Sequence, residues 1–184
     1  MYTLGLLAAL IYTTASHALG PRPGTIKNIV SFGDSYTAPG ITGDNGTAWP
    51  GYVADYARLT LYDFAKAGAT CSNNLTFRPF PSIMESQVPL FLEEKNNGTL
   101  NELARNEDET VYTLWIGTND VGVSALLTGG QANGITIVDT VTCAVDWVSL
   151  MYKNGARNFV FQNVCASLRP CNAFTQLLQK DDPP

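Results

Sequence analysis

The chain has 184 residues, of which 45% are hydrophobic and 15% are charged, and its formal net charge is −5. This length suits one domain with a sizeable core, and the apolar content excludes an intrinsically disordered chain. We do not expect nucleic acid or an anionic membrane surface as a partner. Clustered basic residues bind phosphate groups, and the chain has no run of basic residues.

The first 18 residues have the pattern of a secretory signal peptide, although no basic residue lies near their start. An uncharged apolar run covers Leu4 to Tyr12, and Ser16-His17-Ala18 places small residues before a cleavage site. A membrane anchor is the alternative, but the run has about half of the ~20 residues that a membrane-spanning helix needs. We therefore expect a secreted, extracellular protein without a membrane span, whose mature domain begins at residue 19.

The rest of the chain alternates predicted strands, which are short apolar runs, with predicted helices, which carry apolar residues at helical spacing. In chain order these are a strand over Lys27–Phe32, a helix over Trp49–Leu59, a strand over Leu61–Ala67, a helix over Ser82–Lys95, a strand over Thr110–Ile116, a helix over Ile137–Tyr152 and a strand over Asn158–Gln162. In the last helix, one apolar stripe contains Ile137, Val141, Val145, Val148 and Tyr152. This order predicts an α/β fold, a three-layer α/β/α sandwich with a central parallel sheet.

Four cysteines and three N-glycosylation triplets agree with a secretory route. The cysteines, which are Cys71, Cys143, Cys165 and Cys171, lack the paired spacing of a zinc site and allow three disulfide pairings, among which the sequence does not choose. The triplets begin at Asn45, Asn74 and Asn97. No metal or nucleotide cofactor is expected, because the one histidine is His17 and no phosphate-binding glycine pattern follows the first strand.

Three of the predicted strands end in turns with chemically useful groups, at the sheet edge where such folds bind ligands. Ser35 follows the first strand, where its hydroxyl is either a nucleophile or a helix cap. Gly68 follows the second strand, where glycine either lets a backbone N–H approach a ligand or only forms a turn. Asn119 follows the third strand, as an amide donor or as part of an Asx turn.

Together, the segments Ser31–Thr37, Ala67–Thr70 and Leu114–Val121 resemble the SGNH (GDSL-type) ester hydrolases, in particular the fungal secreted esterases of carbohydrate esterase family 16. The resemblance covers roughly Lys27 to Val164 and implies a flavodoxin-like fold. It also implies that Ser35 is the acyl nucleophile and that the N–H groups of Ser35 and Gly68 and the side-chain amide of Asn119 form the oxyanion hole.

The implied function is a carboxylic ester hydrolase that removes acetyl or other short acyl groups, with a small-molecule or carbohydrate ester as its substrate. The resemblance implies no cofactor, and we expect a monomer. Asp34 is expected to shape the turn before Ser35, because the family takes its catalytic acid from a late Asp-X-X-His motif.

The chain departs from this family at its C-terminal end, where the Asp-X-X-His motif is missing. A serine hydroxyl is a poor nucleophile without a base, so we predict slow ester cleavage at best. The sequence predicts an incomplete hydrolase domain over 19–164, truncated before its last strand and helix, and a non-family tail over 165–184. Two alternatives remain. The first is a non-catalytic pseudo-esterase that binds a glycan or lipid ester, with Tyr36, Trp49 and Tyr52 as candidate sugar-stacking aromatics. The second is a non-functional fragment.

Overall fold

The computed structural model describes residues 20–40, 47–105 and 107–162. The predicted signal peptide, the glycosylation triplet at Asn45, the cysteines Cys165 and Cys171, and the predicted tail over 165–184 lie outside these residues. The predictions made for them stay predictions.

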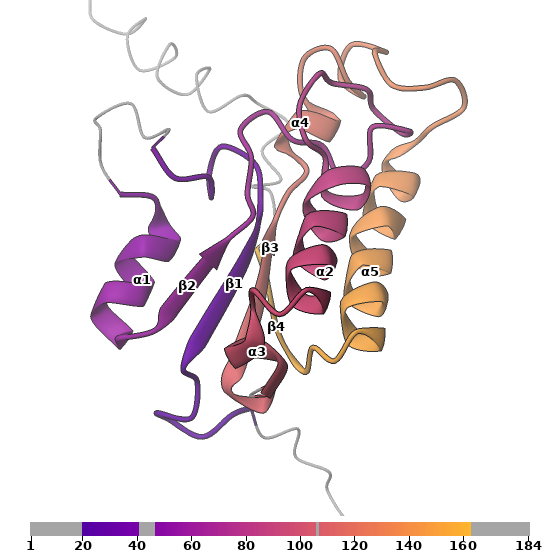
Figure 1. The fold of residues 1–184 in the computed structure, drawn as a ribbon. Coiled ribbons are helices and arrows are strands. Elements are labelled where there is room, and N and C mark those ends of the chain that lie inside the picture. The colour runs from indigo at the N-terminus through magenta and orange to yellow at the C-terminus, as the bar shows by residue number, and fades with distance from the viewer. Residues whose placement is uncertain (1–19, 41–46, 106, 163–184) are drawn as a thin grey trace, which may run out of the picture.

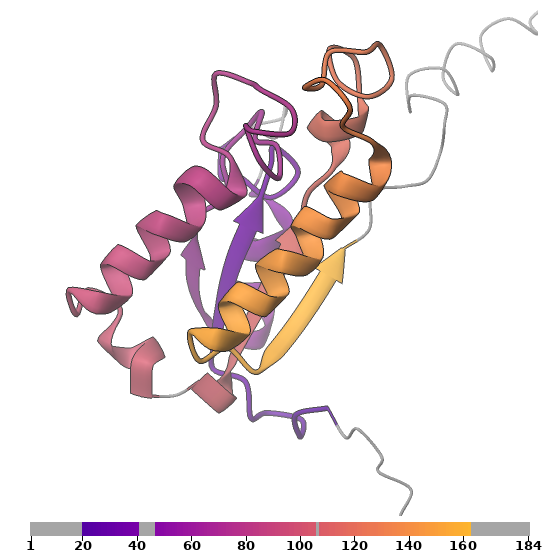
Figure 2. The ribbon, with the colours of Figure 1, turned by 90° about the vertical axis from the view of Figure 1, so that its right-hand side faces the viewer.

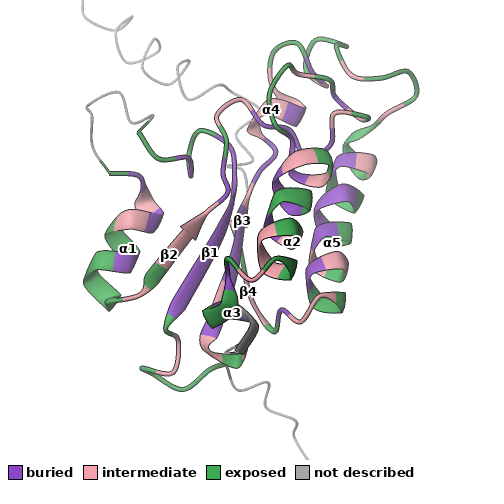
Figure 3. Ribbon diagram, viewed as in Figure 1, coloured by how far each residue is buried: buried purple, intermediate pink, exposed green. Residues whose placement is uncertain are grey.

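Four parallel strands form the central sheet, in the spatial order β2-β1-β3-β4 (Figure 1). Their bounds are β1 Asn28–Gly33, β2 Thr60–Asp63, β3 Thr110–Trp115 and β4 Asn158–Gln162. All six residues of β1 are buried, because the strand lies inside the sheet and between the helical layers (Figure 3). The parallel sheet predicted from the alternating pattern is confirmed.

The helices lie on both faces of the sheet: α1 on one face, and α2 and α5 side by side on the other (Figures 1 and 2). Their bounds are α1 Trp49–Ala57, α2 Val88–Asn96, α3 Asn101–Arg105, α4 Thr118–Val121 and α5 Ile137–Lys153, with a 3-10 turn at Glu107–Glu109. The three-layer architecture is therefore confirmed. Among the residues that the structure describes, no helix combines the length and the apolar character that a membrane crossing requires.

The helix predicted over Ser82–Lys95 is two pieces, because a π-helical turn over Ile83–Gln87 precedes α2. In this turn the N–H of Gln87 donates to the carbonyl of Ser82, and the N–H of Val88 donates to that of Ile83, both over five residues. Pro89 explains the change, because proline has no N–H to donate and its ring crowds the preceding turn of an α-helix.

Aromatic side chains form the centre of the core between the sheet and the α2–α5 layer. The ring of Phe32 in β1 lies 5.5 Å from those of Phe64 and Trp147 and 5.6 Å from that of Phe91. Trp147 belongs to α5 and is fully buried. Long-range packing of these rings fixes how the helices sit on the sheet.

Helix α5 buries a different face from the apolar stripe that predicted it. Of the predicted stripe, Val148 packs partly against the core, but Ile137, Val141, Val145 and Tyr152 are each more than half exposed. The buried residues of α5 are Thr140, Cys143, Ala144, Trp147 and Met151 (Figure 3). Both faces carry apolar side chains, so hydrophobic spacing alone does not choose between them. The contact of Trp147 with Phe32 and the disulfide at Cys143 decide the orientation.

Candidate active site

The turn after β1 holds Ser35 outward at the carboxyl edge of the sheet. Gly33, Asp34 and Thr37 are buried, but Ser35 itself is exposed. The N–H groups of Thr37 and Ala38 donate to the carbonyl of Asp34 at 3.1 and 2.9 Å. The local hydrogen bonds therefore fix the backbone on both sides of Ser35 while its side chain stays accessible.

Gly33, the last residue of β1, is packed too closely for any side chain. A Cβ atom at this position would lie 2.6 Å from the carbonyl oxygen of Trp115 on the neighbouring strand. The side-chain amide of Gln87 accepts from the Gly33 N–H at 3.1 Å and donates to its carbonyl at 2.9 Å. Gln87 is a buried positioning residue that the sequence analysis missed, because a glutamine in a predicted helix carries no signal of such a contact.

Gly68, on the segment after β2, needs both its backbone conformation and its missing side chain. Its φ of 76° lies in the left-handed region, and a Cβ atom would lie 2.5 Å from the ring of Phe80. Glycine is the residue that adopts such a conformation without steric cost. The structure thus brings Phe80, which is partly exposed, against the backbone of Gly68.

Asn119 lies in α4, just after β3, and its amide joins this turn to the segment of Gly68. Asn119 Nδ2 donates to the carbonyl of Ala69 at 2.9 Å, and Asp120 Oδ1 accepts from the N–H of Cys71 at 2.9 Å. The structure therefore brings Asn119 and the Gly68–Ala69 backbone together. Since an amide nitrogen carries two hydrogens, Asn119 keeps one donor beyond the bond to Ala69.

The turn of Ser35 lies between these two segments in the sheet order, because β1 pairs with β2 on one side and with β3 on the other. Trp115, at the end of β3, accepts from the N–H of Asp34 at 3.3 Å. All three strands run parallel, so the three segments leave the sheet at the same edge. The roles assigned to Ser35, Gly68 and Asn119 stay predictions.

Two carboxyl groups, those of Asp34 and Asp120, are buried beneath the candidate site. Burial raises the pKa of each from 3.8 to about 6, and the charge of Asp34 further raises the pKa of Asp120. Asp34 Oδ1 accepts from the N–H of Tyr36 at 3.0 Å, as Asp120 Oδ1 does from Cys71. Within the described part of the chain, the Oδ2 atoms of both carboxyl groups lack a hydrogen-bond partner.

These raised pKa values make the folded state bind protons more tightly than the unfolded state between pH 3.8 and about 6. The contribution of both groups to stability therefore increases as the pH falls from 7 through this window. We expect Asp120→Asn, which keeps the acceptor for Cys71, to reduce this increase by about 1–3 kcal/mol. Urea unfolding at several pH values between 7 and 4 measures the difference.

Asp139→Asn is the matched control, because hydrogen bonds from Thr136 lower the pKa of this exposed carboxylate. Its stabilising effect is lost as the pH falls, so its removal should change the pH profile in the opposite direction. A profile of Asp120→Asn that coincides with that of the unmodified protein would contradict the prediction.

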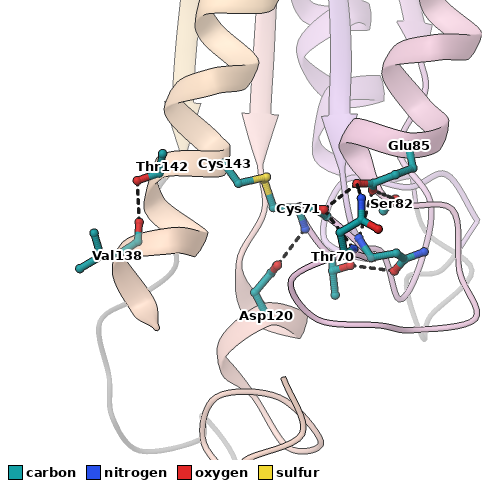
Figure 4. Close-up of a disulfide and its surroundings, with 11 residues drawn as sticks. Thr70, Cys71, Ser82, Glu85, Asp120, Val138, Thr142 and Cys143 are labelled. Carbon is teal, nitrogen blue, oxygen red and sulfur yellow. Dashed lines mark hydrogen bonds between the residues drawn. A yellow bond between two sulfur atoms is a disulfide. The ribbon is translucent and has the colours of Figure 1, made fainter. Parts of the chain in front are cut away.

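A disulfide between Cys71 and Cys143 anchors the segment of Gly68 to helix α5 (Figure 4). It is one of the pairings that the sequence left open. Next to it, Glu85 accepts from the hydroxyls of Ser72 and Ser82, both at 2.5 Å, and these hydrogen bonds lower the pKa of its carboxylate despite partial desolvation. The disulfide and Glu85 together hold the loop after Gly68.

A cavity of about 310 Å³ lies beside this disulfide. Its lining includes Met84, Glu85 and Cys143 but none of Ser35, Gly68 and Asn119, so it is separate from the candidate site. Over the described residues, no group of three or more histidine, cysteine, aspartate and glutamate side chains could hold a metal ion. The described residues also contain no histidine.

Comparison with known proteins gives the class of this fold and site. Residues 29–169 match the GDSL-like Lipase/Acylhydrolase family, and the chain belongs to that family. The resemblance of the three sequence segments to the SGNH (GDSL-type) ester hydrolases is thereby confirmed.

Two fungal relatives are similar to the chain. It is 29% identical over 194 residues to an acetylesterase of Hypocrea jecorina, and the alignment covers 89% of this chain and 55% of that protein. It is 25% identical over 169 residues to an acetylesterase of Thermothelomyces thermophilus, and the alignment covers 75% of this chain and 53% of that protein. The chain therefore spans about half the length of the curated relatives it matches.

Proposed function

We propose that the protein is a secreted hydrolase of carboxylic esters that removes acetyl or other short acyl groups, with carbohydrate esters as its substrates. The observation that carries the proposal is the exposed Ser35 on a hydrogen-bonded turn between the Gly68 segment and the Asn119 turn. Membership of the acylhydrolase family and the similarity to two acetylesterases support it.

In the proposed reaction, Ser35 Oγ attacks the ester carbonyl carbon, and the carbonyl oxygen becomes negatively charged. The N–H groups of Ser35 and Gly68 and the free Nδ2 hydrogen of Asn119 donate to this oxyanion, and one such donor is typically worth about 3 kcal/mol. The alcohol leaves, and water then attacks the acyl-serine, releases the acid and restores the hydroxyl. The serine proton needs an acceptor in the first step.

No histidine among the described residues supplies that acceptor, and the one histidine of the whole sequence is His17. We therefore propose that the 184-residue chain cleaves esters slowly. The same observation favours a second candidate function, a pseudo-esterase that binds a glycan or lipid ester without turnover.

Hydrolysis of p-nitrophenyl acetate by the purified 184-residue protein tests the first function against the second. We expect a slow release of p-nitrophenol that Asn119→Ala reduces by about 10²- to 10³-fold. With imidazole added as the base, we expect a faster release that Ser35→Ala prevents. Thermal unfolding of each variant checks that it is folded. Equal rates for the unmodified protein and Ser35→Ala in the presence of imidazole would refute the catalytic role of Ser35 and leave the binding function.

A further inference from the structure

The residue after Ser35 presents an aromatic ring to solvent. Tyr36 is 49% exposed, and its ring lies on that of Trp115 with centroids 5.3 Å apart and an interplanar angle of 10°. Since Trp115 stacks on one face of the Tyr36 ring, a second flat group could stack only on the opposite face. This half-exposed, stacked ring belongs to the residue that follows the predicted nucleophile in the chain.

Neighbouring groups hold this stacked pair in place. The N–H of Tyr36 donates to Asp34 Oδ1 at 3.0 Å, which fixes the backbone beneath the ring. Trp49, at the start of α1, has its ring 6.5 Å from that of Trp115 and donates through Nε1 to Thr37 Oγ1 at 3.2 Å. The platform is therefore assembled from α1, the turn after β1 and the end of β3 before any ligand binds.

The two exposed tyrosines of α1 stack on each other and not on a residue of the sheet. Tyr52 and Tyr56 stack on each other at 6.4 Å along the surface of α1, and Tyr56 is 86% exposed. Tyr56 lies seven residues beyond Trp49, which corresponds to about 10 Å along a helix. It is a suitable control for nonspecific effects of removing a surface tyrosine.

We propose that the exposed face of Tyr36, backed by Trp115, is a stacking site for a pyranose ring in the alcohol part of the ester. A neutral pyranose has an apolar face of C–H groups and hydroxyls at its rim, so it fits a flat ring that needs no opposite charge. A rigid aromatic residue offers a large contact area at a small cost in conformational entropy. The inference rests on the proposed function, because it places the sugar where its ester reaches Ser35.

Titration of the 184-residue protein with xylotetraose, cellotetraose and mannotetraose tests the inference by calorimetry. None of these sugars carries an ester, so the measurement needs no turnover. We expect at least one of them to bind, and Tyr36→Ala to weaken that binding tenfold or more. Tyr36→Phe, which keeps the ring, and Tyr56→Ala should bind as the unmodified protein does.

Three outcomes would overturn the proposal. The first is that none of the three sugars binds, and the second is that a folded Tyr36→Ala variant, checked by thermal unfolding, binds them equally well. The third is that p-nitrophenol binds and none of the sugars does. The last outcome would assign the ring to aryl groups. Failure of the proposed function is read separately, because it appears as ester hydrolysis that does not depend on Ser35 even with added imidazole, whatever the sugar titration gives.

Discussion

The 184-residue protein is expected to hydrolyse p-nitrophenyl acetate on the order of 10⁶-fold more slowly than the full-length acetylesterase of Hypocrea jecorina. The physical reason is the serine proton, because removal of the base alone costs a serine hydrolase about this factor in turnover. Steady-state rates of both proteins, measured under the same conditions, check the prediction. Rates within tenfold of each other would show that another group of this chain accepts the proton.

Imidazole added to the solution sharpens this test. If the missing base is the cause of slow turnover, added imidazole should accelerate hydrolysis by the unmodified protein and the acceleration should saturate with imidazole concentration. Ser35→Ala is the matched control, because it retains the oxyanion donors of Gly68 and Asn119 and reports the cleavage by imidazole itself. An equal acceleration for both proteins would contradict a base deficiency at Ser35.

Replacement of both Cys71 and Cys143 by alanine is expected to lower the free energy of unfolding by about 4 kcal/mol. The disulfide joins residues 72 positions apart, so its loss increases the conformational entropy of the unfolded chain and thereby stabilises the unfolded state. Alanine is chosen over serine because Cys71 is fully buried, and a serine there would bury a hydroxyl group. Urea unfolding of the double variant and of the unmodified protein, both under oxidising conditions, measures the change.

The same variant should also affect the site, because Cys71 lies three residues after Gly68 and its N–H donates to Asp120. We expect the slow hydrolysis to fall further even at temperatures where the variant is folded, because the disulfide holds the segment of Gly68. A decrease of less than about 1 kcal/mol in the free energy of unfolding would contradict the structural role of this disulfide.

Much of the candidate site could be predicted because its signals are local. A buried strand followed by a turn with glycine and a polar residue recurs at Ser35, Gly68 and Asn119, and each pattern occupies only a few consecutive positions. Parallel strands then bring such turns to the same edge of the sheet. The contacts that support them, such as Gln87 with Gly33 and Asp120 with Cys71, could not be predicted, because they join residues 54 and 49 positions apart.

Residue types at short spacing were enough to predict the alternation of strands and helices, the parallel sheet and the order of the three motifs. The buried face of α5 and the pairing of the cysteines depend instead on contacts between distant segments of the folded chain. Both faces of that helix carry apolar side chains, so the choice followed from the fit of Trp147 against Phe32 and from the distance between Cys71 and Cys143. Side-chain packing between distant segments made these choices, and local hydrophobic spacing carries no information about it.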